Sequence, residues 1–168
     1  AVVVQISLAL CVVGCTTNRP PAICALHPDE LEIWATVLPQ HSVVEGTTQE
    51  SRVALGGAAA SVDYLRSTFP QLAPEAAESF VQENAIPCAF EKIDGRASVI
   101  STARLRRFFA LSRFFPLRGW RSLRRTYGED VELVMLSRPG LNSAHDHAIL
   151  DMGRSCGLLC GHGVLLHL

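Results

Sequence analysis

The spacing of the apolar residues changes once along this chain, and this change limits the possible folds more than any other feature. Before about residue 128, apolar residues recur at intervals of three and four, as at Val62, Leu65 and Phe69, which is typical of amphipathic helices. From Val131 onward they alternate with a period of two, which is typical of strands. Because short connections join these strands, the pattern predicts a single α+β domain, with N-terminal helices followed by a C-terminal antiparallel β-meander.

The limits of the expected elements come from start and stop signals. Two acidic residues follow Pro28, as in the first turn of a helix, and Pro74 suits the first position of another. The segment Arg138-Pro139-Gly140 predicts a turn between the first two strands of the meander. Helices are expected from residue 28 onward and at 58–69, 75–84, 102–109 and 119–127, and strands at 42–47, 97–100, 131–137, 147–153 and 163–168.

The first fourteen residues carry no charge and contain a continuous apolar run from Ile6 to Val13. That run is too short to span a bilayer, which needs about 20 residues, and its length suits the apolar region of a signal peptide. The segment Val12-Val13-Gly14-Cys15 resembles the lipobox of bacterial lipoproteins, in which the cysteine is acylated. Two acyl chains hold a protein at a membrane far more firmly than one chain does. The alternative is a buried N-terminal strand with incidental cysteines.

These observations divide the chain into three parts. Residues 1–14 are expected to be the remnant of a signal peptide, and residues 15–27 to hold the lipid-attachment site Cys15 and a polar tether. Residues 28–168 are expected to form the α+β globular domain, truncated at its C-terminus because no turn or cap follows the last strand. The expected location is the cell envelope, with the protein exported and bound to the membrane through its lipid.

Three segments near the C-terminus carry a family resemblance: LSRPGLN at 136–142, AILDMG at 148–153 and CGLLCGHG at 156–163. They are similar to a family of bacterial proteins predicted to be secreted or lipid-anchored, whose pattern runs roughly LSRxGFN, ALVYVG and CGGLCGxG. The chain departs from that pattern at Leu141, where the family favours Phe, and at Asp151, where it favours Tyr. The resemblance implies an envelope location and no particular activity.

The cysteines of the mature part suggest covalent cross-links. Cys156 and Cys160 would face each other across a hairpin loop, at a separation that a disulfide accepts, and export supplies the oxidising compartment. A local Cys156–Cys160 bridge leaves Cys24 and Cys88 as a second pair by elimination. The alternative for Cys24 and Cys88 is a pair of buried free thiols.

A metal site is the main rival interpretation of the C-terminal cysteines. Cys156, Cys160 and His162 have a spacing that zinc tolerates, and His145 and His147 could complete the set. In a third interpretation one cysteine is a nucleophile and His162 its base, but no visible residue orients that base. The disulfide is favoured because oxidation outcompetes zinc in most exported cysteine pairs, so no cofactor is expected.

Charge is distributed unevenly although the net charge is only −1. Residues 29–94 hold eleven acidic and three basic residues, whereas residues 95–128 hold nine arginines and no acid. The arginines from Arg104 to Arg125 alternate with aromatic residues, which favours two amphipathic helices whose arginines are solvated or paired with the acidic half. In the alternative, Arg121, Arg124 and Arg125 bind an anionic surface such as lipid headgroups.

The sequence therefore predicts a cell-envelope lipoprotein that acts through binding or structure, because no convergent acid, base and nucleophile is visible. Its expected partner is the membrane, through the lipid anchor; nucleic acid is not expected at this net charge, and a protein or a small molecule both remain open. The alternative function is a zinc-binding protein or an enzyme that uses Cys156, Cys160 and His162.

Overall fold

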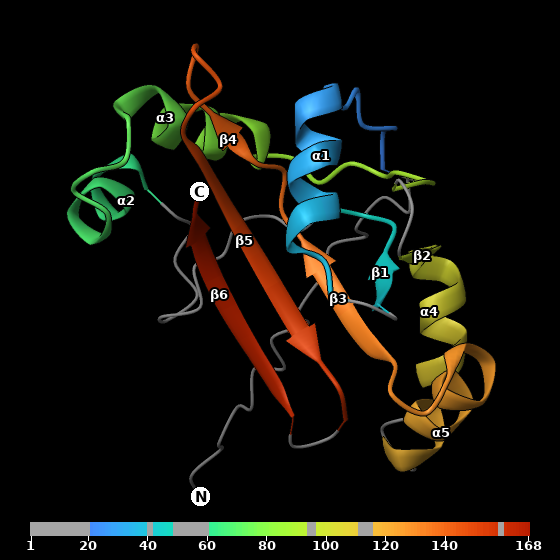
Figure 1. Ribbon diagram of the computed structural model, residues 1–168. Coiled ribbons are helices and arrows are strands. Elements are labelled where there is room, and N and C mark those ends of the chain that lie inside the picture. The colour runs from blue at the N-terminus through green and yellow to red at the C-terminus, as the bar shows by residue number, and fades with distance from the viewer. Residues whose placement is uncertain (1–20, 40–41, 49–60, 94–96, 111–115, 158–159) are drawn as a thin grey trace, which may run out of the picture.

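The computed structural model describes residues 21–39, 42–48, 61–93, 97–110, 116–157 and 160–168 (Figure 1). Over these residues the chain forms five helices and six strands. None of these helices has the length and apolar character that crossing a membrane requires. In chain order the elements are α1 (Pro28–Val37), β1 (Ser42–Glu45), α2 (Val62–Thr68), α3 (Pro74–Glu83), β2 (Ser98–Ile100), α4 (Thr102–Phe109), α5 (Pro116–Tyr127), β3 (Glu132–Leu136), β4 (Gly140–Leu141), β5 (Ala148–Ser155) and β6 (Gly161–His167).

Local signals explain where most of the helices begin. Ser61 precedes α2 and Ser101 precedes α4, and each hydroxyl accepts a hydrogen bond from a backbone N–H of the first helical turn. Pro28 and Pro74 occupy the first positions of α1 and α3, where a missing N–H costs nothing. At α1 the Glu30 carboxylate also accepts a hydrogen bond from the backbone N–H of His27, at 2.7 Å.

The six strands form one mixed sheet. β1 lies between β2 and β3 and runs parallel to both. β5 then pairs antiparallel with β3, and β6 pairs antiparallel with the other edge of β5. The short strand β4 pairs with the same edge of β5 as β3 does, nearer the beginning of β5.

The predicted α+β class is confirmed, but the expected order of helices first and strands last is wrong. β1 and β2 lie between helices in the sequence and join the sheet as parallel strands, so the sheet is not a simple antiparallel meander. Parallel neighbours need long crossover connections. The chain supplies them, since α2 and α3 connect β1 to β2, and α4 and α5 connect β2 to β3.

The turn expected at 138–140 is an interruption of a strand instead. β3 and β4 both pair with β5, so the chain continues in one direction through Pro139 and reverses only in the segment that follows Leu141. Proline has no N–H to give to a sheet, which explains why the pairing stops there and resumes at Gly140.

Alternate residues of the central strands face two different layers of helices. Val44, Val134 and Leu150 pack against α1, whereas Val43 and Leu133 pack against α4 and α5. Ile149 packs against α2 and α3, on the same side as α4 and α5. In Figure 1, α1 lies over β1 and β3, with α4 and α5 at one end of the sheet and α2 and α3 at the other. The sheet therefore has helices on both faces.

Candidate functional site

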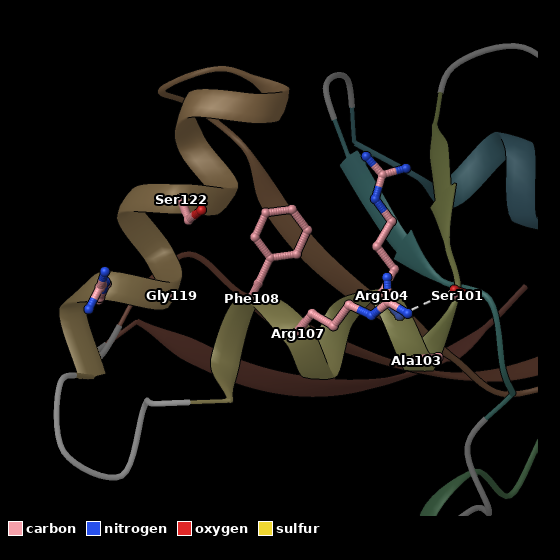
Figure 2. A pocket seen from close by; sticks show the side chains of 8 residues that line it. Ser101, Ala103, Arg104, Arg107, Phe108, Gly119 and Ser122 are labelled. Atoms are coloured by element: carbon pink, nitrogen blue, oxygen red, sulfur yellow. Dashed lines mark hydrogen bonds between the residues drawn. The ribbon is translucent and has the colours of Figure 1, made fainter.

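A cleft of about 730 Å³ opens between α4 and α5. Three arginines contribute to its wall together with two serines and the ring of Phe108, and Figure 2 shows this ring between the two helices. Its lining consists of Ser101, Ala103, Arg104, Arg107, Phe108, Arg118, Gly119 and Ser122.

Helical spacing places these polar side chains on the outer faces of the two helices. Leu105 and Leu123 point the opposite way and are buried against the sheet, which fixes the rotation of each helix. Arg104 and Arg107 are three residues apart on α4, and Arg118 and Ser122 are four residues apart on α5, so each pair shares a face.

Gly119 allows the two helices to approach closely at the cleft. A Cβ atom at this position would lie 2.5 Å from Cδ1 and 2.8 Å from Cε1 of Phe109. Next to it, the rings of Phe109 and Trp120 pack edge to face with their centroids 5.5 Å apart. A side chain at position 119 would therefore push α5 away from α4 and widen the cleft.

The cleft carries uncompensated positive charge. Within the described part of the chain, no carboxylate forms an ion pair with Arg104, Arg107 or Arg118, and all three side chains are exposed. Arg104 lies over the ring of Tyr127, with Cζ 5.9 Å from the centroid. Guanidinium groups that line one cleft without an anionic partner attract phosphate, sulfate or carboxylate groups.

Three acidic residues pair with arginines that lie outside α4 and α5. Glu30 and Glu83 form ion pairs with Arg138, and Glu132 forms one with Arg154. The sequence allows the arginines from Arg104 to Arg125 to be either solvated or paired with acids. The exposed Arg104, Arg107 and Arg118 correspond to the solvated arrangement, since no ion pair joins them to an acid among the described residues.

The arginines that the sequence proposed as anion ligands line a separate hollow of about 420 Å³. Arg121, Arg124 and Arg125 surround it together with Trp120 and Glu129. One of these arginines already has a partner within the protein, because Nη2 of Arg124 donates a hydrogen bond to the carbonyl of Cys156 at 3.0 Å. Sequence reasoning missed Arg104, Arg107 and Arg118, although their spacing relative to Ser101 and Ser122 already placed them on polar helix faces.

Four cysteines form two disulfides in the pairs expected from the sequence. Cys24 and Cys88 have Cα atoms 5.1 Å apart, and Cys156 and Cys160 have Cα atoms 5.2 Å apart. Next to the Cys24–Cys88 disulfide, Ile23 and Ala89 form an isolated β-bridge. Two disulfides are typical of a protein that matures in an oxidising compartment, as exported proteins do.

The histidines that the sequence grouped with these cysteines do not gather around them. His162 pairs with Arg154 near the end of β5, whereas His145 and His147 precede the beginning of that strand. The ring of His147 stacks on that of His167, with Nδ1 and Nε2 3.2 Å apart. The five-residue metal set of His145, His147, Cys156, Cys160 and His162 is thus spread along the length of β5, with its sulfur atoms in a disulfide.

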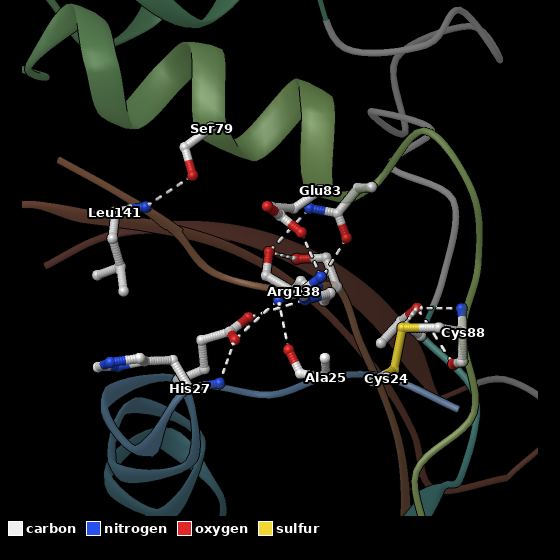
Figure 3. Close-up of polar contacts among 12 residues, drawn as sticks. Cys24, Ala25, His27, Ser79, Glu83, Cys88, Arg138 and Leu141 are labelled. Carbon is white, nitrogen blue, oxygen red and sulfur yellow. Dashed lines mark hydrogen bonds and ion pairs between the residues drawn. A yellow bond between two sulfur atoms is a disulfide. The ribbon is translucent and has the colours of Figure 1, made fainter. Parts of the chain in front are cut away.

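The most connected polar cluster is centred on Arg138 and is structural (Figure 3). Its Nε and Nη2 both bind the buried carboxylate of Glu30 at 2.9 Å, and its Nη1 binds Glu83. Asn84 fixes the backbone on either side, accepting from Arg138 N and donating to its carbonyl. The hydrogen bond to Glu30 helps hold the pKa of Arg138 above its usual value. With its donors occupied in this way, this arginine ties α1 and α3 to the sheet.

Together, the fold and the site define a disulfide-stabilised α+β domain with a cationic cleft between two helices. No protein-family model, no curated protein and no solved structure matches this chain.

Proposed function

We propose that this protein is an exported, lipid-anchored binding protein that holds an oxyanion-bearing ligand in the cleft between α4 and α5. The observation that carries the proposal is that Arg104, Arg107 and Arg118 line one cleft and have no carboxylate partner among the described residues. A binding role in the envelope is also what the sequence predicts.

The chemistry of the cleft suits a small organic anion. Its volume lies inside the range of about 300–1,000 Å³ that small-molecule sites occupy. Guanidinium groups bind phosphate and carboxylate through two parallel hydrogen bonds, and the hydroxyls of Ser101 and Ser122 offer further donors. Phe108 adds an apolar wall against which the carbon part of a ligand can pack.

Binding of phenyl phosphate and of inorganic phosphate, measured by isothermal titration calorimetry at low ionic strength, tests the proposal. We expect phenyl phosphate to bind more tightly, because its ring can pack on Phe108. Arg104→Gln, Arg107→Gln and Arg118→Gln should each weaken binding about tenfold, since a charge-assisted hydrogen bond contributes about 1.5–3 kcal/mol. Added salt should also weaken it.

Arg106→Gln is the matched control, because Arg106 is an exposed arginine on α4 that does not line the cleft. Equal losses in Arg106→Gln and Arg107→Gln would show a diffuse charge effect and contradict the proposal. Binding to vesicles that contain phosphatidylglycerol, measured in parallel, shows whether the anion is a lipid headgroup or a soluble phosphate. Binding to vesicles without binding of either soluble phosphate would identify a lipid headgroup as the ligand of this cleft.

The lipid anchor has its own test, motivated by the resemblance of Val12-Val13-Gly14-Cys15 to a lipobox. The precursor, expressed with its native start, should partition into detergent because acylated Cys15 supplies two chains. The variant Cys15→Ala should remain in the aqueous phase. Unchanged partitioning of a variant whose signal peptide is still cleaved elsewhere would contradict lipidation at this cysteine.

A further inference from the structure

Two histidines and an aspartate meet at the start of α1, far from the arginine-lined cleft in the sequence and in the fold. His27 immediately precedes α1, Asp29 belongs to its first turn, and His145 comes from the turn between β4 and β5. Asp29 and His145 are 116 residues apart in the chain. One ligand atom from each of the three residues lies within 4.8 Å of the other two.

The geometry points to a binding site for a divalent transition metal of the zinc class, and we propose that His27, Asp29 and His145 are its ligands. Zinc holds nitrogen and oxygen ligands at about 2.0–2.2 Å in a tetrahedron, so neighbouring ligand atoms lie about 3.4 Å apart. Nδ1 of His27 and Oδ2 of Asp29 are 3.4 Å apart. Nδ1 of His145 already contacts the same carboxylate oxygen, so an ion would enter by separating these two atoms.

The donor set and its exposure fit this class of metal. Two imidazoles and one carboxylate suit zinc, iron and other first-row ions rather than calcium or magnesium, which prefer oxygen ligands. The ring centroids of the two histidines are 5.4 Å apart, and a nitrogen of each ring lies within 4.8 Å of the other. Their side chains are partly exposed, which gives an ion access and leaves room for water to complete the coordination.

The backbone holds the ligands in place from both sides. His145 has a φ of +58°, a left-handed conformation that is uncommon for a residue with a side chain. Buried Asn142 maintains this turn, because its Oδ1 accepts hydrogen bonds from the backbone N–H groups of Asp146 and His147. On the other side, the backbone of His27 is fixed by Glu30, which Arg138 holds in turn.

Two features oppose a cation here. Nδ1 of His27 accepts a hydrogen bond from the backbone N–H of Asp29 at 3.4 Å, which a metal on that nitrogen would displace. The N-terminus of α1 also carries a partial positive charge, which disfavours a metal ion. The full negative charge of Asp29 lies closer to the proposed ion and outweighs it. The alternative is a plain ion pair between His145 and Asp29 that binds no metal, and experiment separates the two.

Titration of the full chain with Co²⁺ and Zn²⁺ is the test, with disulfides intact and free thiols alkylated beforehand so that cysteine cannot bind the ion. We expect about one equivalent of Co²⁺ to give a visible absorption spectrum that Zn²⁺ abolishes by competition. Asp29→Asn and His145→Asn should each weaken the affinity at least tenfold. Asparagine is chosen at position 145 because it tolerates a positive φ.

His162→Asn and His147→Asn are the matched controls and should bind as the unmodified chain does. Circular dichroism melting of each variant checks that it is folded. The proposal is overturned if the folded chain binds no Co²⁺, if Asp29→Asn and His145→Asn leave the affinity unchanged, or if the control variants lose as much affinity.

Discussion

At the scale of single residues, Asp151 is a carboxylate that burial disfavours in its charged form. It lies inside β5, opposite Leu165 of β6 and two residues from the buried Ile149, and its backbone pairs with that of Ser137. Burial raises the pKa of Asp151, and a hydrogen bond from the backbone of Met152 offsets part of this effect.

The raised pKa predicts a pH dependence of stability. Folded Asp151 holds its proton more tightly than unfolded Asp151, whose pKa is about 3.9. Its contribution to stability is therefore fully present below that value and is lost as pH rises through the folded pKa. Asp151→Asn should raise the melting temperature at pH 7 and reduce the fall of stability with rising pH. Thermal melts from pH 3 to pH 8 measure this, and the exposed Asp130→Asn serves as control. Equal pH profiles for Asp151→Asn and the unmodified chain would contradict it.

At the scale of elements, the contact between β4 and α3 depends on a missing side chain. Gly140 lies so close to α3 that a Cβ atom would be 2.5 Å from the backbone N of Phe80 and would also overlap the carbonyl oxygen of Ala76. These are backbone atoms that cannot move independently of the helix. The close packing of α3 on β4 therefore depends on the absence of a side chain at position 140.

Gly140→Ala should destabilise the domain by about 1–3 kcal/mol, the usual cost of inserting a methyl group into a closely packed contact. Gly161→Ala is the matched control, because its Cβ would meet nothing nearer than 3.6 Å. We expect that variant to stay within about 0.5 kcal/mol of the unmodified chain. Chemical denaturation measures both, and a Gly140→Ala variant as stable as Gly161→Ala would show that α3 can shift freely.

At the scale of the whole molecule, the two disulfides differ in what they constrain. Cys24 and Cys88 are separated by 64 positions in the chain, and Cys156 and Cys160 by only 4. The first link joins the segment before α1 to the segment after α3, whereas the second closes the turn between β5 and β6. Loop-closure entropy grows with loop length, so the long link restricts the unfolded chain more.

Removing each disulfide should reveal this difference. The chain-entropy relation gives about 4 kcal/mol for the Cys24–Cys88 loop and about 2 kcal/mol for the Cys156–Cys160 loop. We therefore expect the double variant Cys24→Ala with Cys88→Ala to lose about twice the free energy of unfolding that Cys156→Ala with Cys160→Ala loses. Denaturation of both variants under the same conditions is the measurement. A larger loss from the short loop would contradict the entropic explanation.

The local features of this fold could be predicted from the sequence. The helix expected at 102–109 forms over Thr102–Phe109, and the strand expected at 147–153 forms over Ala148–Ser155. Helix caps, proline positions and the period of the apolar residues specify these elements, and each of these signals involves only residues close together in the sequence. The two disulfides could be predicted as well, Cys156–Cys160 from the geometry of its short loop and Cys24–Cys88 by elimination. The upstream part of the helix expected at 58–69 and the segment around Cys15 lie outside the described residues.

The long-range features could not be predicted in the same way. The apolar pattern of residues 42–47 and 97–100 does not tell a parallel neighbour from an antiparallel one, because these segments are too short to separate a continuous apolar run from an alternating one. The candidate sites depend on the same information. Asp29 meets His145 only because β4 and β5 bring their connecting turn to the start of α1. Likewise Arg118 joins Arg104 and Arg107 only because Gly119 lets α5 approach α4.

The Cys24–Cys88 link also sets how the domain responds to a mechanical pull. When the chain is stretched between its two ends, tension that arrives at Cys24 crosses directly through the sulfur atoms to Cys88. The segment between these cysteines, which contains α1, β1, α2 and α3, is then outside the load path. His27 and Asp29 lie in this segment and would not be loaded by such a pull. If the protein is tethered to a moving surface by its N-terminus, the covalent Cys24–Cys88 bond resists the stretching force. The hydrogen bonds of the neighbouring Ile23–Ala89 bridge would then bear little of that force.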